Sequence, residues 1–244
     1  AEDLELSKNG FINEGEVATR LGLEGINEVA EKIIIERDLA LLEKYPCRYH
    51  INQISSEKSL EVIKKNKKEG KKFTSGVSIN NLSLNENDIG EFKTFLKISP
   101  PLRAENDRIS LINGIQDNLI DVIVSDHSPE DEESKRLPFA QAATGAIGVE
   151  TLLPLSLEMY HNESLHLNKI IETLTINPAK ILKIKKGSLT KGSDGDICIF
   201  DLEAPWVIEA DKLKSKSKNT AIEGRKLQGK VLMTFLNGQL VYSH

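Results

Sequence analysis

The stretch Ile120-Asp-Val-Ile-Val-Ser-Asp-His-Ser-Pro129 decides the fold. Residues 121–125 form a nearly continuous apolar run, which is typical of a strand in a parallel sheet covered by helices on both faces. The strand ends abruptly at Asp126, His127 and Pro129. In a β/α barrel the chemistry lies at the carboxyl ends of the strands, where a carboxylate can bind a metal ion or accept a proton. Asp126 is therefore a candidate catalytic residue; the alternative is that Asp126 caps a turn and His127 is structural.

Short strands and helices alternate on both sides of this stretch. The expected strands are residues 48–54 and 73–78, and the expected helices are residues 15–45 (in two pieces split at Gly22 and Gly25), 59–68, 107–116, 148–160 and 167–175. Ser56 is placed to cap the second of these helices, and Asn177-Pro178 to start a further helical turn. Alternation at this spacing predicts a parallel α/β sheet or barrel.

The character of the chain changes near Lys185. The remainder is made of short apolar stretches, at residues 196–200, 206–208, 230–235 and 239–242, and Asn237-Gly238 predicts a hairpin turn. We therefore divide the chain into an α/β part, residues 1–185, and a small β part, residues 186–244.

Composition favours a soluble, cytoplasmic globular protein. Of the 244 residues, 39% are hydrophobic and 28% charged, no apolar run reaches the ~18 residues of a membrane span, and no leader opens the chain. The net charge of -5 gives no support for nucleic-acid binding, and Cys47 and Cys198 are expected to be reduced thiols. The chain opens with Ala1-Glu2-Asp3-Leu4 and no initiator Met, so we expect a trimmed chain or a fragment.

Three further sites are open to more than one interpretation. His50 and Gln53 flank the end of the strand at residues 48–54, but a lone histidine is more often packed than a ligand. Arg103 follows Pro100-Pro101 and could contact an anion, cap a helix or form a surface pair. Residues 142–148 are small and precede a helix, which suits an anion or carbonyl group at the backbone N–H groups or simply tight packing.

Nine motifs in this order resemble the dihydroorotases of the amidohydrolase superfamily. They are Glu2-Asp3-x-x-Leu6, Asn13-Glu-Gly-Glu-Val17, Pro100-Pro-Leu-Arg103, Ser125-Asp-His-Ser-Pro129, Gly145-Ala-Ile-Gly-Val-Glu-Thr151, Thr175-Ile-Asn-Pro-Ala179, Lys191-Gly-Ser-Asp-Gly-Asp196, Ser215-Lys-Ser-Lys-Asn-Thr220 and Gly224-Arg-x-x-x-Gly229. The resemblance implies a metal-dependent-hydrolase barrel of the TIM type, partial in this chain, followed by a small β-sandwich segment. It also implies a hydrolase of pyrimidine biosynthesis that interconverts carbamoyl aspartate and dihydroorotate.

The resemblance also implies a degenerate metal site. Family members hold one or two zinc ions through a His-x-His pair, an Asp or carboxylated Lys, two later histidines, and an Asp that is also the general acid/base. That Asp corresponds to Asp126, which makes Asp126 a metal and catalytic position. One later histidine corresponds to Gln53, a neutral amide and a poor zinc ligand. The other ligands would precede Ala1, so we expect zinc to be absent or weakly bound.

Two of the substrate positions implied by the family also carry residues that differ from the family pattern. Ser99 stands in place of an asparagine, and Glu130 replaces a histidine, where a like charge would repel the anionic substrate. Thr144 and Gly145 remain compatible with the family's substrate loop.

Two functions follow from the resemblance. The first is a hydrolase acting on a small-molecule pyrimidine precursor, with Asp126 moving the proton. The second, which Gln53 and Glu130 favour, is a pseudoenzyme that assembles with aspartate transcarbamoylase; an allantoinase-like hydrolase is a minor third possibility. A partial barrel has open sheet edges, so we expect an exposed edge or a homo-oligomer that buries it.

Overall fold

The computed structural model describes residues 2–244 and falls into two compact units. Ala1, the first residue of the opening discussed above, lies outside the described residues. The first unit runs up to Val149 and includes Lys214–Ala221, and the second comprises Glu150–Leu213 and Ile222–His244. Between residues 2 and 244, no helix has both the length and the apolar character required to cross a membrane.

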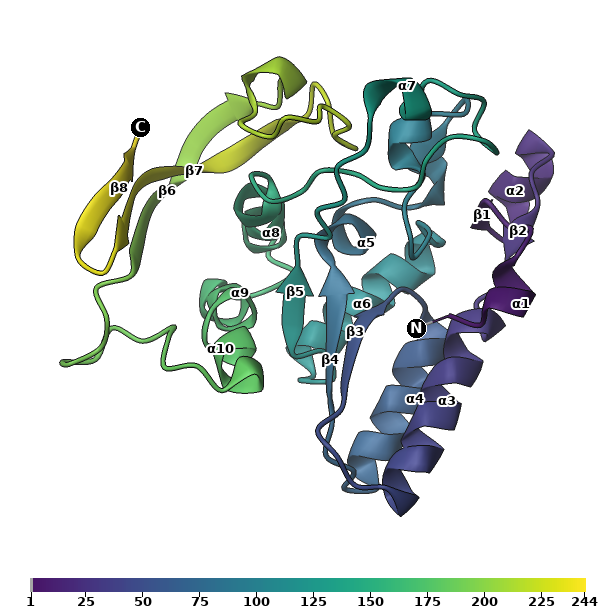
Figure 1. Ribbon diagram of the computed structural model, residues 1–244, viewed down its shortest axis with the longest axis horizontal. Helices are drawn as coiled ribbons and strands as arrows, with labels where there is room; N and C mark the ends of the chain where they lie inside the picture. Colours follow the sequence, from purple (N-terminus) through teal and green to yellow (C-terminus); the bar gives the residue numbers. More distant parts are fainter. Residues whose placement is uncertain (1) are drawn as a thin grey trace. The chain divides into compact units, whose positions relative to one another are not determined.

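The first unit contains a parallel three-stranded sheet (Figure 1). Its strands are β3 (His50–Ile54), β4 (Thr74–Ser78) and β5 (Val122–Val124), in the order β3-β4-β5. The predictions of these strands and of their parallel arrangement are confirmed. The carboxyl ends of parallel strands lie at one edge of a sheet, so the residues that end β3, β4 and β5 come together there.

The carboxyl end of β3 is irregular. Ile51 pairs with Ser75 but Ile54 pairs with Val77, so the pairing register shifts between Ile51 and Ile54. Such a bulge bends the strand and re-aims its side chains. The backbones of β3 and β4 also lie close together here. A Cβ atom on Gly76 would lie only 2.4 Å from the Asn52 carbonyl oxygen.

Three long helices accompany the sheet. They are α3 (Val29–Lys44), α4 (Glu57–Lys68) and α6 (Glu105–Gln116), and α4 packs against both of the others. The Ser56 side chain accepts a hydrogen bond from the Ser59 N–H, so the predicted cap of α4 is confirmed. The split of the first helical region is also confirmed: α2 (Glu16–Leu21) ends at Gly22, which has a φ of 65°.

Short elements complete the first unit, and most of them were not predicted because they are too short to show a period. They are α1 (Leu4–Ser7), β1 (Ile12–Asn13), β2 (Gly25–Ile26), α5 (Ile79–Ser83), η1 (Glu86–Ile89), η2 (Thr94–Leu96) and α7 (Glu132–Lys135). Several of them support the strand ends, as described below.

The second unit combines three helices with an antiparallel sheet. Its elements are α8 (Leu152–His161), α9 (Leu167–Leu174), α10 (Ile176–Leu182), β6 (Ile197–Val207), η3 (Ala210–Lys212), β7 (Lys226–Leu236) and β8 (Gln239–Ser243), with sheet order β6-β7-β8. Asn237 and Gly238, with φ values of 51° and 77°, form the predicted hairpin turn. The expectation of separate strands at 196–200 and 206–208 is wrong, because β6 continues through a register shift between Asp201 and Pro205.

Candidate functional site at the strand ends

Asp126 lies just beyond β5, and both of its carboxylate oxygens accept hydrogen bonds. Gln53 Nε2 donates to Oδ1 at 2.7 Å, and Ser78 Oγ donates to Oδ2 at 3.1 Å. Gln53 is the residue before the last one of β3, Ser78 ends β4, and Asp126 follows β5. Asp126 has a φ of 51°, a conformation that non-glycine residues seldom adopt and that is enriched at functional sites. The structure thus brings Asp126 and Gln53 together.

Sequence reasoning missed Ser78. Ser78 is the last residue of β4. Its hydroxyl also accepts a hydrogen bond from the Asn80 N–H, so Ser78 is the N-cap of α5. A serine between a strand and the polar pair Asn80-Asn81 is a capping signal, and that signal could have placed Ser78 at the strand ends.

The residues around Asp126 do not fit a zinc ion. Zinc sites are built from His, Cys, Asp and Glu, usually with four ligands, whereas the groups that contact Asp126 are an amide N–H and a hydroxyl. Over residues 2–244, the structure groups no three or more such side chains in a way that could hold a metal. The Asp126 carboxylate thus accepts hydrogen bonds from two neutral side chains, Gln53 and Ser78.

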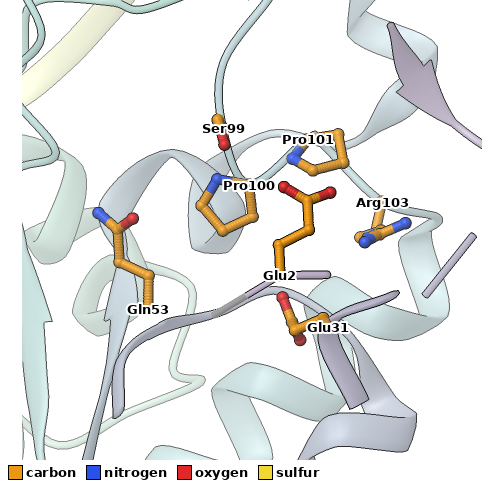
Figure 2. Close-up of a pocket in the computed structure, with 7 residues that line it drawn as sticks. All are labelled: Glu2, Glu31, Gln53, Ser99, Pro100, Pro101 and Arg103. Carbon is orange, nitrogen blue, oxygen red and sulfur yellow. The ribbon is translucent and has the colours of Figure 1, made fainter. Parts of the chain in front are cut away.

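A small polar pocket lies beside Gln53 (Figure 2). Its volume is about 90 Å³, and it is lined by Glu2, Glu31, Gln53, Ser99, Pro100, Pro101 and Arg103. Gln53 and Ser99, both expected at the site, therefore share one cavity. Burial raises the pKa of Glu2, although the Arg103 guanidinium opposes the shift, and Glu2 Oε1 is buried without a hydrogen-bond partner in the described part of the chain. Glu2 and Glu31 were not anticipated from the sequence.

Arg103 lines this pocket and is held in place by hydrogen bonds. Its Nε donates to Ser55 Oγ at 3.1 Å, and its Nη1 donates to Asn13 Oδ1 at 2.9 Å and to the Ile26 carbonyl at 2.6 Å. The side chain is only 3% exposed. The alternatives of helix capping and surface pairing are therefore wrong: Arg103 is a buried link between the site and β1 and β2.

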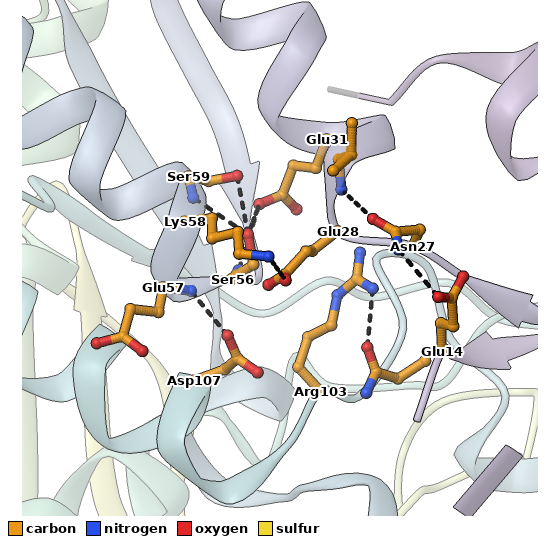
Figure 3. Close-up of polar contacts among 12 residues, drawn as sticks. Glu14, Asn27, Glu28, Glu31, Ser56, Glu57, Lys58, Ser59, Arg103 and Asp107 are labelled. Carbon is orange, nitrogen blue, oxygen red and sulfur yellow. Dashed lines mark hydrogen bonds and ion pairs between the residues drawn. The ribbon is translucent and has the colours of Figure 1, made fainter. Parts of the chain in front are cut away.

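Glu31, on α3, holds the turn that follows β3. Its carboxylate accepts hydrogen bonds from the backbone N–H groups and the hydroxyls of both Ser55 and Ser56, at 2.6–3.3 Å. Figure 3 shows the Glu31–Ser56 contact and the nearby bond from the Glu57 N–H to Asp107. Because Ser55 lies two residues after Gln53, this network fixes the carboxyl end of β3.

His50 lies at the other end of β3 and does not reach the site. It is the first residue of the strand, and its Nδ1 lies 2.7 Å from Thr74 Oγ1. Burial lowers the pKa of His50, partly offset by Asp121. The expectation that His50 flanks the carboxyl end is wrong, and the packed-histidine interpretation is correct.

The loop that contains Thr144 and Gly145 lies against the segment that follows Asp126. The Ser128 N–H donates to the Ala146 carbonyl at 2.8 Å, and a Cβ atom on Gly145, whose φ is 150°, would lie 2.8 Å from Ser128 Cβ. Thr144 itself is exposed. The loop is thus placed at the strand ends, although the helix after it begins only at Leu152.

Glu130 and His127 extend this contact. The Glu130 N–H donates to Asn219 Oδ1 at 3.3 Å, and His127 Nδ1 accepts from the Gly148 N–H at 3.1 Å. His127 is therefore bound to backbone, as the structural alternative supposed. Asn219 lies in the Ser215–Thr220 motif, to which sequence reasoning assigned no contact.

Comparison with known proteins identifies the family. The sequence model of the amidohydrolase family matches residues 14–241, and the chain belongs to this family. It is 46% identical over 244 residues to the dihydroorotase of Ehrlichia canis, and 44% identical over 243 residues to that of Anaplasma phagocytophilum. These alignments cover 100% and 99% of this chain but 55% and 54% of the relatives, so the chain spans about half the length of the curated relatives it matches.

Solved structures agree with the fold. L-hydantoinase (dihydropyrimidinase) from Arthrobacter aurescens superimposes with a TM-score of 0.82 at 28% identity, over 88% of this chain and 49% of that chain. Dihydropyrimidinase from Brevibacillus agri gives 0.83 at 20% identity over the same shares, which is a likeness of fold alone. The predicted membership and the α/β amidohydrolase fold are confirmed.

Proposed function

We propose that the protein is a dihydroorotase-type member of the pyrimidine biosynthetic pathway whose Asp126 centre, as this chain builds it, is non-catalytic. The dihydroorotase relatives support the pathway. The observation that carries the non-catalytic centre is the kind of group that reaches the two Asp126 oxygens: the Gln53 amide and the Ser78 hydroxyl, where a zinc site is built from His, Cys, Asp or Glu.

These neighbours work against metal-assisted catalysis at Asp126. An ionised carboxylate offers about four acceptor sites, so Asp126 can still accept a proton beside these two bonds, but neither neighbour is a residue type that would share a zinc ion with it. Replacing imidazole by the Gln53 amide removes a zinc ligand. Glu130, in the segment that follows Asp126, would add repulsion toward an anionic cyclic amide.

The wider architecture is part of the same proposal. β3, β4 and β5 would form an arc of a TIM-type barrel, and β6–β8 would belong to a small β-sandwich, with the division after residue 185. Further strands, from a longer chain or from a second copy, would cover the outer edges of β3 and β5. The length of the relatives, about twice that of this chain, supports this arrangement.

Aspartate transcarbamoylase is the partner that this proposal favours. Gln53 and Glu130 are internal substitutions that weaken catalysis without disturbing the described fold, as a protein retained for assembly would tolerate. Size-exclusion chromatography of the intact protein mixed with purified aspartate transcarbamoylase tests the association. Co-elution supports the partner role, and separate elution at micromolar concentrations contradicts it.

The test of the centre combines zinc content with turnover. The purified intact protein is first dialysed against a zinc-containing buffer and then freed of unbound zinc. We expect it to retain far less than one zinc per chain at the Asp126 centre and to show no dihydroorotate hydrolysis above background. Gln53→His should raise zinc affinity by about tenfold or more, and adding Asp126→Asn should abolish that gain. Gln116→His, which adds an exposed histidine on α6, is the matched control.

A clear result would overturn the proposal. Stoichiometric zinc together with turnover in the unmodified protein, both lost in Asp126→Asn, would show that the centre is catalytic. Zinc binding equal in Gln53→His and Gln116→His would show that Gln53 is not the residue that blocks the metal.

A further inference from the structure

Lys135, the last residue of α7, carries a fully buried ammonium group. Its Nζ donates to the backbone carbonyls of Ala143 at 2.8 Å, Gly145 at 2.9 Å and Lys97 at 3.3 Å, and its relative exposure is 0%. An ammonium has three protons to donate, and three carbonyls accept them. All three acceptors are neutral backbone carbonyls rather than carboxylates.

A second lysine, Lys97, binds the same loop. Lys97 Nζ donates to the carbonyls of Ala140 at 3.0 Å and Ala142 at 2.8 Å, and it lies 5.1 Å from the centre of the Phe11 ring, within cation–π range. The carbonyls of Ala140, Ala142, Ala143 and Gly145 are thus all bound by lysine ammonium groups. The backbone of residues 140–145 wraps around two cations supplied by the protein.

The Lys135 ammonium also joins two parts of the candidate site. The Lys97 carbonyl accepts from Lys135 Nζ and from the Gly145 N–H at 2.9 Å. Lys97 lies two residues before Ser99, and Gly145 follows Thr144, so one cation links the segment of Ser99 to the loop of Thr144 and Gly145. Asn219 Nδ2 adds a bond to the Gly145 carbonyl at 3.2 Å.

Packing alone does not account for a lysine at this position. A buried cation pays a desolvation penalty that an apolar side chain of similar length avoids. Burial lowers the pKa of Lys135 to about 8, with Glu130 opposing the shift and Lys97 adding to it. Without the ammonium the Ala143 carbonyl would lose its bond to Lys135, and the Lys97 and Gly145 carbonyls would each lose one of two donors. An apolar side chain cannot replace these bonds.

The geometry points to Lys135 as a positioning residue: its ammonium is a built-in cation that holds residues 140–146 against the segment after Asp126 and in register with the segment before Ser99. The loop presents the backbone around Thr144 and Gly145 to whatever ligand the site accepts. This role rests on the proposed function only for the identity of that ligand. The organisation of the loop is independent of zinc and of turnover.

Chemical rescue tests the role directly. Lys135→Ala in the intact protein removes a propylammonium fragment, so amide hydrogen exchange is measured by mass spectrometry with and without n-propylammonium chloride. We expect exchange in residues 140–147 to rise at least about tenfold, while β3, β4 and β5 stay protected. Propylammonium should restore protection, whereas 1-propanol or sodium chloride at the same concentration should not. Lys72→Ala, at an exposed lysine, should change neither region.

Lys135→Met and the unmodified protein keep the test decisive if the alanine variant does not fold. The methionine keeps an apolar stem without the charge, so it should loosen residues 140–147 as the alanine does. In the unmodified protein, competitive acetylation should label Lys135 at least about tenfold more slowly than Lys72, because a caged amine is reached only by local opening. Wild-type exchange in Lys135→Met, rescue by 1-propanol, or equal labelling of Lys135 and Lys72 would each overturn the inference. None of these readouts changes if the protein proves to be an active hydrolase.

Discussion

Two carboxylates near the end of β3 differ in how the protein satisfies them. Glu31 is 2% exposed and accepts bonds from two backbone N–H groups and two hydroxyls of Ser55 and Ser56. Asp126 is half-buried and accepts bonds from the side chains of Gln53 and Ser78. Backbone donors are fixed by the fold, whereas side-chain donors change with a single substitution. The comparison separates a carboxylate with backbone donors, Glu31, from one whose side-chain donors a single substitution can change, Asp126.

Replacing Glu31 should have the largest effect on stability. Glu31→Ala leaves the buried N–H groups and hydroxyls of Ser55 and Ser56 without their acceptor, and unpaired buried donors cost about 1–3 kcal/mol each. We expect the free energy of unfolding, measured by urea titration, to fall by about 3–5 kcal/mol. Glu61→Ala, on the exposed side of α4, should cost less than about 0.5 kcal/mol. A loss below about 1 kcal/mol in Glu31→Ala would show that the serines find other acceptors and that the two carboxylates do not differ.

The elements that were predictable carry local signals. Ser56 as a helix cap, Gly22 as a helix end and the Asn237-Gly238 hairpin depend on residues adjacent in sequence. β6 was misjudged because its apolar stretches at 196–200 and 206–208 are separated in sequence, whereas the strand continues between them, through Pro205, where the register shifts. Short-range chemistry thus predicts where elements start and stop but not how a long strand bends.

The candidate site was predictable from two signals: the strand end made Asp126 a candidate, and the family motifs added Gln53. Asp126 and Gln53 are far apart in the chain, and the resemblance alone placed them together. Glu31 and Lys135 have no such marker, since each is a charged residue among other charged residues, and their partners are brought near by tertiary packing. Burial of a charge is decided by the fold, so the sequence pattern does not reveal it.

Lys135 makes a pH-dependent contribution of intermediate size. Its pKa in the folded protein, about 8, lies below the ordinary lysine value of 10.5, so between these values the unfolded chain binds more protons. Stability therefore rises with pH in this window. Relative to Lys135→Met, the free energy of unfolding of the unmodified protein should increase by on the order of 2 kcal/mol from about pH 7 to about pH 10. Urea titrations at both pH values measure this. Glu130 and Lys97 are the charged groups that face the ammonium, and a pH-independent difference between the two proteins would show that burial does not shift the Lys135 pKa.

Asp126→Asn should have the smallest effect and gives the sharpest contrast with Glu31. Asp126 is half-buried, so water can replace a lost partner, and the Gln53 amide can rotate to offer either its oxygen or its nitrogen. The Ser78 hydroxyl can still donate to the new amide oxygen. We expect the free energy of unfolding to change by less than about 1 kcal/mol, by the same urea titration used for Glu31→Ala. A loss of more than about 2 kcal/mol would place Asp126 with Glu31 among the carboxylates that hold the fold, because only a network that cannot rearrange would respond so strongly to the exchange of one oxygen for an NH₂ group.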